Sequence, residues 1–186
     1  MTDETLLLPL ENLVEALLFV NPSPLSAELL QKTLTHLLKR SISSEELSEA
    51  IEKLRTRYAS TSIELMEVAG GYALRTRPEY GALLAQALGL QTPIRLSKPL
   101  LEALALIAYH QPTTKAFVSQ IRGAQSDYAV DRLLELELIE PAGRLDLPGK
   151  PLTYRTTAKF LELLGLRSLS DLPKPTDFSQ NSLSAS

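Results

Sequence analysis

Hydrophobic residues recur at helical spacing in three successive segments that precede residue 60. The first segment, residues 10–20, has its leucines and valines on one face and ends at two prolines, which lack the backbone donor that a helix needs. Ser26 stands where the N-cap of a second helix is expected, because its short side chain can accept a hydrogen bond from the first helical turn. Ser43 and Glu46 have the spacing of a capping box and predict the start of a third helix.

The hydrophobic pattern changes from helical to extended after these helices. Residues 63–68 and 72–76 are short runs rich in β-forming side chains, and Gly70-Gly71 lies between them, which predicts a hairpin. Pro78 fits the first turn of a further helix that closes the unit, since proline there gives up only a donor that has no helical partner. The inner face of this closing helix is expected to hold Leu83, Leu84 and Leu88.

The same order of elements returns in the second half of the chain. Three helical patterns follow one another from Ser97 to Glu135, and a closing helix is expected after Thr157. The second of these helices is expected to bury Phe117, Val118 and Ile121, and the strands before the closing helix are Leu138–Ala142 and Leu152–Thr156. Two such units are typical of winged-helix domains, so we expect an α+β, mainly α protein with two tandem winged-helix domains.

The two repeats divide the chain into four regions. We expect an N-terminal winged-helix domain over residues 1–90, a linker over 91–96 and a C-terminal winged-helix domain over 97–169. Residues 170–186 are rich in Pro, Ser, Asp, Lys and Gln and hold few apolar anchors, which predicts a disordered tail.

Composition argues against catalysis. Among 186 residues there are 40 leucines but no cysteine, so thiol nucleophiles and thiolate metal ligands are excluded. His36 and His110 lie far apart in the sequence, and the hairpin explains Gly70-Gly71, because no Lys-Ser or Lys-Thr follows at the spacing of a phosphate-binding loop. The sequence predicts no catalytic residue, no cofactor and no metal site, and we expect a protein that is not an enzyme.

No segment is predicted to cross a membrane. The longest apolar runs, such as Leu13–Val20, have about half the length that a bilayer helix needs. The first five residues carry acids where a secretory signal needs bases, and the absence of cysteine is typical of a reducing compartment. We therefore expect a cytoplasmic protein.

Winged helices often bind DNA, so a DNA-binding transcriptional regulator is the alternative function. The third helix of the second unit, residues 126–137, carries four acids and one base, and its counterpart in the first unit is rich in glutamate. Acids at this position oppose entry into the negatively charged major groove. The net charge is −3, and the basic residues beside the second hairpin, which allow at most a weak DNA contact, are Arg144, Lys150, Arg155 and Lys159.

The N-terminal helix has more apolar residues than one buried stripe requires. Small domains have much surface relative to core, and an uncovered apolar remainder usually marks an interface. The surplus therefore predicts a dimer surface, and the alternative is a leucine-rich core with a frayed N-terminus. The residues assigned to the dimer surface are Leu10, Leu13, Val14 and Leu17.

Ordered short motifs run through both units. In the second unit the most distinctive are Ile107–Pro112 (IAYHQP), Ile121-Arg122-Gly123 and Pro148–Pro151 (PGKP). The first unit adds Glu15–Phe19 (EALLF) and Gly70-Gly71-Tyr72. In this combination, over nearly the whole chain, the sequence resembles the ScpB family, the segregation and condensation proteins of bacterial chromosomes.

The resemblance implies the accessory subunit of a condensin-like complex, associated with the nucleoid and without catalytic activity of its own. Members form homodimers mainly through their N-terminal domains and bind the kleisin ScpA, which engages the heads of the Smc ATPase. Leu136-Glu137 departs from the basic residue and glycine that the family often has, which further weakens a DNA role. Kleisin contact is expected in the C-terminal domain, at Tyr109, Gln111, Pro148, Lys150, Pro151 and Tyr154.

Overall fold

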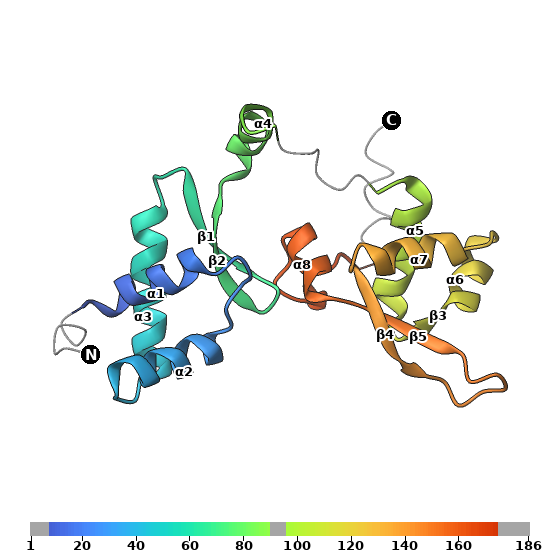
Figure 1. Cartoon of the computed structure of the whole chain (residues 1–186), viewed down its shortest axis with the longest axis horizontal. Helices are drawn as coiled ribbons and strands as arrows, with labels where there is room; N and C mark the ends of the chain where they lie inside the picture. The colour runs from blue at the N-terminus through green and yellow to red at the C-terminus, as the bar shows by residue number, and fades with distance from the viewer. Residues whose placement is uncertain (1–7, 90–95, 175–186) are drawn as a thin grey trace. The chain divides into compact units, whose positions relative to one another are not determined.

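The computed structural model describes residues 8–89 and 96–174, and the chain divides into two compact units, residues 1–92 and 93–186 (Figure 1). Of the predicted linker, only Leu96 is among the described residues. Residues 175–186 of the predicted tail also lie outside them.

Both units consist of helices followed by an antiparallel hairpin and a further helix. The N-terminal unit contains α1 (Leu10–Val20), α2 (Ala27–Leu38), α3 (Ser44–Tyr58), β1 (Ile63–Val68), β2 (Gly71–Thr76) and α4 (Pro78–Ala87). The C-terminal unit contains α5 (Lys98–His110), β3 (Thr113–Thr114), α6 (Lys115–Arg122), α7 (Asp127–Glu135), β4 (Ile139–Arg144), β5 (Leu152–Thr156), α8 (Ala158–Leu164) and a 3₁₀ turn, Leu169–Asp171. The protein is α+β and mainly helical, which confirms the predicted fold class.

Two helices of the N-terminal unit begin at the predicted caps. Ser26 Oγ accepts a hydrogen bond from the Leu29 amide at 3.1 Å. Ser43 Oγ accepts from the Glu46 amide at 3.1 Å, and Glu46 Oε2 accepts from the Ser43 amide at 2.9 Å, so the capping box is complete. The pKa of the Glu46 carboxyl is lowered chiefly by the hydrogen bond from the Ser43 amide and secondly by the one from Arg40, because both favour the charged form.

The N-terminal core lies where α1, α2 and α3 meet, around the fully buried Val14 and Leu54. At the edge of this core, the Tyr58 hydroxyl and the Arg57 guanidinium both donate to the Glu15 carboxylate. These bonds fasten α1 to the last turn of α3. Burial raises the pKa of Tyr58 to about 12, and the bond to Glu15 adds to the rise, since an ionised tyrosine could not donate it.

The two glycines of the first hairpin serve different purposes. Gly70 has a φ of 73° and makes the turn, as predicted. Gly71 is already part of β2, and a Cβ on it would lie 2.7 Å from the carbonyl atoms of Leu25. Leu25 pairs with Tyr72 through two backbone hydrogen bonds of 2.9 Å, so Gly71 is needed for the close approach of this segment rather than for the turn.

The C-terminal unit has a three-stranded antiparallel sheet in the order β3-β5-β4. The sequence pattern did not predict β3, because a two-residue strand leaves no alternation to detect. Thr114 pairs with Thr153 in this sheet, and its hydroxyl also caps α6 by accepting from the Phe117 amide at 3.2 Å. Helices α5 and α7 pack beneath the sheet around the fully buried Ile107, Val130 and Leu133.

The C-terminal unit continues beyond residue 169, where the tail was expected to begin. Phe160 in α8 is only 2% exposed, and Leu172 packs against the same core. Asp171 accepts hydrogen bonds from the backbone and side chain of Arg167, which shapes the 3₁₀ turn. Residues 170–174 therefore belong to the folded unit.

The predicted inner face of α4 is wrong. Leu83 and Leu88 are 63% and 66% exposed, and no residue of α4 is buried. The helix follows β2 directly and stands apart from the three helices of its own unit (Figure 1). Because the core of the unit is already closed by α1, α2 and α3, periodicity predicted the helix but not a surface for it to cover.

Candidate partner-binding surfaces

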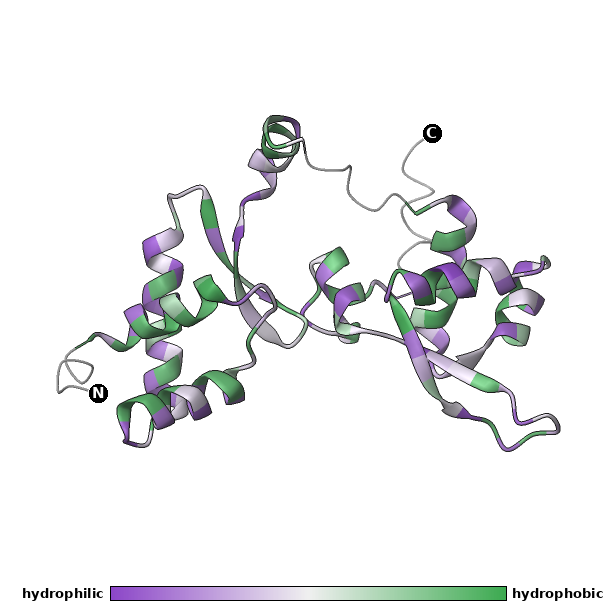
Figure 2. Cartoon of the chain, viewed as in Figure 1, coloured by the Kyte–Doolittle hydropathy of each residue, from purple (hydrophilic) through white to green (hydrophobic). Residues whose placement is uncertain are grey.

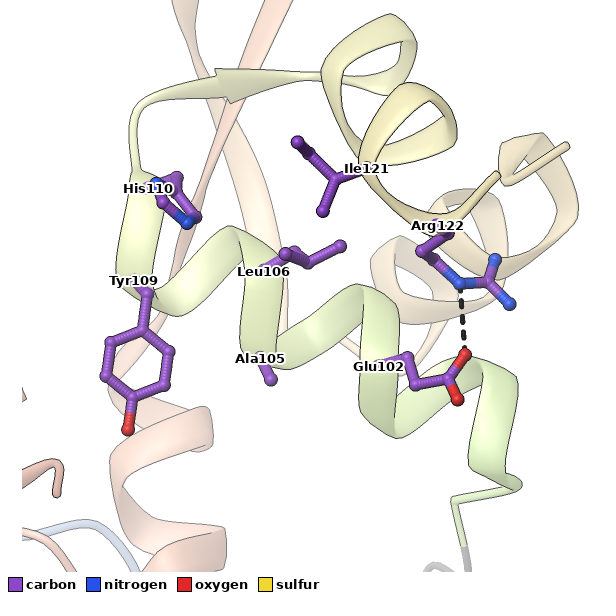
Figure 3. A pocket seen from close by; sticks show the side chains of 7 residues that line it. All are labelled: Glu102, Ala105, Leu106, Tyr109, His110, Ile121 and Arg122. Carbon is purple, nitrogen blue, oxygen red and sulfur yellow. Dashed lines mark hydrogen bonds and ion pairs between the residues drawn. The ribbon is translucent and has the colours of Figure 1, made fainter. Parts of the chain in front are cut away.

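An open groove runs along the surface between α5 and α6. Its volume is about 460 Å³. Figure 3 shows the side chains that line it, with two aliphatic side chains in the middle and polar groups at both ends. The lining residues are Glu102, Ala105, Leu106, Tyr109, His110, Ile121 and Arg122.

The apolar middle of the groove comes from Leu106 and Ile121, which face each other across the two helices (Figure 3). Ile121 is 55% exposed, although the sequence pattern predicted it to be buried with Val118. Val118 alone reaches the core, because α6 is short and lies at the edge of the unit. An aliphatic side chain this exposed beside a hollow is typical of a surface that receives a partner.

Each end of the groove is held by specific contacts. At one end the Arg122 guanidinium lies 3.3 Å from the Glu102 carboxylate and donates to the Ser126 hydroxyl at 2.8 Å. The Arg122 side chain is only 10% exposed, so this charge is fixed in place. At the other end the His110 ring packs against Phe117 with 5.2 Å between ring centroids.

The groove has the chemistry of a peptide-docking site. An apolar centre with fixed polar groups at both ends can bury two or three apolar side chains of a protein segment and orient its backbone or charges. Among the residues that the structure describes, no group of three or more His, Asp or Glu side chains could hold a metal ion. His36 and His110, which belong to separate units, are both exposed.

Comparison with known proteins identifies the family. The model of the family described as "Segregation and condensation complex subunit ScpB" matches residues 12–175. The chain belongs to this family. The resemblance inferred from the sequence motifs is thereby confirmed.

Other members of the ScpB family cover most of the chain. "Segregation and condensation protein B" of Syntrophotalea carbinolica is 42% identical over 92% of this chain and 84% of the relative. The protein of the same description from Carboxydothermus hydrogenoformans is 42% identical over 88% of this chain and 86% of the relative. The crystal structure of ScpB from Mycobacterium tuberculosis is 30% identical, covers 84% of this chain and 95% of that one, and superposes with a TM-score of 0.38, too low to compare the folds.

The residues predicted for kleisin contact in this ScpB-family chain do not form one surface. Tyr109 lines the groove, and its hydroxyl donates to the Pro173 carbonyl at 2.5 Å. Tyr154 is 5% exposed and belongs to the core. Gln111 accepts hydrogen bonds from the amide and hydroxyl of Thr156 at 2.7 and 3.1 Å, so it joins the end of α5 to β5.

The other three predicted contact residues lie at the end of the second hairpin. Pro148 and Lys150 are exposed, and Pro151 is half-buried. The tip is shaped by its own backbone, since the Lys150 amide donates to the Leu147 carbonyl at 2.8 Å and the Arg144 guanidinium donates to the Lys150 carbonyl at 2.9 Å. This tip is a second candidate contact surface, and its more exposed leucine is Leu147, at 56%.

The residues predicted for the dimer surface lie mostly inside the N-terminal unit. Val14 is fully buried and leaves no surface for a partner. Leu10, Leu13 and Leu17 are half-buried and pack against the same core. The apolar side chains that α1 exposes are at its end, where Phe19 is 77% and Val20 71% exposed.

The sequence pattern did not single out Leu106 as a groove residue, although a signal for it exists. Helix α5 reads KPLLEALALIAYH, and its apolar residues extend well beyond the stripe that reaches the core. A helix that is apolar around most of its circumference must cover a second surface. That signal, applied to α5, points to the α5/α6 groove.

Several basic side chains around α7 and the second hairpin are paired with acids. Lys115 lies 2.5 Å from Asp131 of α7, and this hydrogen bond raises the pKa of the lysine. Other pairs are Arg132 with Glu135 at 2.6 Å, Arg155 with Glu140 at 2.7 Å and Lys159 with Glu137 at 2.7 Å. None of the described helices is both long and apolar enough to span a membrane.

Proposed function

We propose that this protein is a non-enzymatic accessory subunit of the condensin-like Smc–ScpA–ScpB complex and acts in chromosome condensation and segregation. It works as a homodimer that binds the kleisin ScpA and reaches Smc only through ScpA. It acts in the cytoplasm, on the nucleoid. Membership of the ScpB family supports the place of the protein in this complex.

The α5/α6 groove is the observation that carries the proposal. Its apolar centre at Leu106 and Ile121 favours a protein segment with aliphatic or aromatic side chains. The Arg122–Glu102 pair at one end, in which the arginine side chain is only 10% exposed, gives such a segment a polar anchor. The groove therefore supports binding, and the ScpA segment is its proposed occupant.

The charges of α7 argue against the alternative of a DNA-binding regulator. Asp127, Asp131 and Glu135 are exposed on this helix, which a DNA-binding winged helix would insert into the major groove. Two of the four basic residues beside the hairpin, Arg155 and Lys159, are paired with carboxylates, as is Arg132 of α7, which reduces the positive charge available to phosphates. We expect at most weak, salt-sensitive DNA binding.

Ile121→Glu tests the groove. Calorimetric titration of ScpA from the same organism is expected to show at least a tenfold weaker affinity for this variant than for the unchanged protein, because a carboxylate replaces the apolar centre. The matched control is Leu147→Glu, because Leu147 on the hairpin is exposed to the same extent, 56% against 55%. An unchanged affinity for Ile121→Glu, or a loss confined to Leu147→Glu, would assign ScpA to another surface.

Two further results bear on the proposal as a whole. The proposal would be contradicted if the unchanged protein and ScpA formed no complex at micromolar concentrations. It would also be contradicted by submicromolar, sequence-selective binding of the protein alone to duplex DNA, measured by fluorescence anisotropy at low salt and again at 200 mM salt.

A further inference from the structure

The last described residues of the C-terminal unit are fastened beside the α5/α6 groove. Leu172 packs against the core of the unit, and the next residue, Pro173, accepts a hydrogen bond from the Tyr109 hydroxyl at 2.5 Å. Tyr109 lines the groove at the end opposite the Arg122–Glu102 pair (Figure 3). The chain therefore leaves the folded unit at a fixed point, next to a residue of the groove wall.

The backbone is extended where it leaves the unit. Leu172 has φ −64° and ψ 135°, and it precedes Pro173, which disfavours helical backbone in its predecessor. Lys174 precedes Pro175 and is restricted in the same way. The residues that follow are therefore joined to the unit by a stiff connection, which lowers the entropy that they lose on binding to a nearby surface.

Residues 175–186 continue from this point and are called the terminal segment. Their sequence is PTDFSQNSLSAS, in which Phe178 and Leu183 are the two large apolar side chains and Asp177 is the one charged residue. A segment of this composition has no core in which to bury an aromatic ring. Any burial of Phe178 therefore requires a surface outside the terminal segment.

Phe178 can reach the apolar centre of the groove. It follows Pro173 by five residues, which span at most about 17 Å when extended. Leu106 precedes Tyr109 by three residues of α5, or about 5 Å along the helix axis. Ile121 faces Leu106 and is 55% exposed, so an apolar surface lies within this reach. Figure 2 shows hydrophobic residues along both helices of the groove.

We propose that the terminal segment binds in the α5/α6 groove of its own chain, with Phe178 between Leu106 and Ile121, and competes there with the partner segment. This inference rests on the proposed function, because it gives the ScpA site a competitor within the same chain. Asp177 then lies toward the His110 end of the groove, away from the carboxylate of Glu102, so no groove acid opposes it.

The tether makes a weak contact sufficient for this competition. A short flexible connection holds a segment near its site at an effective concentration on the order of 1 mM. A contact with a dissociation constant of a few tenths of that value fills the groove for most of the time. ScpA then binds only the fraction of molecules whose groove is free, and its apparent affinity falls by that fraction.

The absence of cysteine allows the terminal segment to be located without ScpA. One variant carries Ala105→Cys, at an exposed position of the groove, and Ser179→Cys, and the equilibrium of this disulfide with glutathione gives the effective concentration of the two thiols. Adding Phe178→Ser is expected to lower this concentration at least fivefold, because the tether keeps its length and only the apolar contact is lost. Asn181→Ser in the same background is the matched control and is expected to change nothing.

A second substitution in the same background identifies the surface. Ile121→Glu in the groove is expected to lower the effective concentration as Phe178→Ser does, whereas Leu147→Glu on the hairpin is not. An effective concentration that Phe178→Ser leaves unchanged overturns the proposal. A fall with Phe178→Ser but not with Ile121→Glu places the terminal segment on another surface and overturns it as well.

Calorimetric titration with ScpA tests the competition in the full chain. Phe178→Ser alone is expected to bind ScpA at least threefold more tightly than the unchanged protein, and Asn181→Ser with unchanged affinity. An unchanged affinity for Phe178→Ser overturns the competition, and the proposed function stands if Ile121→Glu still weakens ScpA binding. If no ScpA complex forms, the proposed function and the competition both fail, and the disulfide equilibrium still decides whether the terminal segment binds in the groove.

Discussion

The two units share an order of elements and differ in how each closing helix is used. In the C-terminal unit Thr157 caps α8, whose Phe160 enters the core at 2% exposure. In the N-terminal unit α4 buries nothing. The two units also differ in their third strand, which is β3 in one and a single bridge between Leu25 and Tyr72 in the other.

This difference shows that a repeated pattern of elements does not imply repeated packing. The C-terminal unit covers its closing helix with its own residues and offers a groove on its outer surface. The N-terminal unit completes its core with α1, α2 and α3 and leaves its closing helix without a covering surface. Of the two units as the structure describes them, the N-terminal one therefore leaves more apolar side chain of its closing helix exposed.

The largest expected effect contrasts the two closing helices. Phe160→Ala is expected to lower the free energy of unfolding of the C-terminal unit by about 3–5 kcal/mol, because it empties a fully buried aromatic site. Leu83→Ala removes a side chain that is 63% exposed and is expected to cost less than about 0.5 kcal/mol in the monomer. Urea unfolding followed by circular dichroism, at the lowest practical protein concentration, measures both. Similar losses would mean that α4 packs within its own chain as α8 does.

A smaller effect concerns the bridge that replaces a third strand in the N-terminal unit. Gly71→Ala is expected to destabilise this unit by about 1–3 kcal/mol, because the new Cβ meets the Leu25 backbone. Gly81→Ala is the control, since its Cβ meets nothing within 4 Å and alanine favours the helix by about 0.5–1 kcal/mol. Thermal unfolding of both variants measures the difference. If Gly71→Ala melts at the same temperature as the unchanged protein, the expected clash with Leu25 is contradicted.

The smallest effect concerns the link between α1 and α3. The Tyr58 hydroxyl has a pKa of about 12 in the folded chain against 10.0 for an ordinary tyrosine, so it keeps its proton longer when folded. Its contribution to stability is fully present below pH 10 and is lost as the pH rises from about 10 to 12. Urea unfolding across this range is expected to show a loss of about 1 kcal/mol that Tyr58→Phe lacks. Identical pH profiles for the two proteins would show that ionisation of Tyr58 does not change the free energy of unfolding.

The sequence predicted those parts of the fold that depend on neighbouring residues. The caps at Ser26 and Ser43, the turn at Gly70 and the proline start of α4 are local interactions, and each lies where predicted. The short motifs spread along the chain also sufficed to identify the family. These features can be predicted without knowing which helices and strands pack against one another.

The parts that sequence reasoning missed depend on distant contacts. The exposure of Ile121 and Leu83 depends on which elements lie opposite them, and helical spacing only groups residues on a face. Gln111 belongs to the IAYHQP motif, yet it joins α5 to β5, and Tyr154, which was predicted with it for kleisin contact, is in the core. A motif thus combined residues that maintain the fold with Tyr109, which lines the groove.

Thr114 has a consequence for how the C-terminal unit opens. Its backbone pairs with Thr153 in the sheet, and its hydroxyl caps the helix that carries Ile121. Separation of β3 from β5 is therefore expected to weaken the side-chain cap of α6 as well. In hydrogen exchange, we expect the Phe117 amide and the amides that pair β3 with β5 to lose protection together, because Thr114 takes part in both contacts.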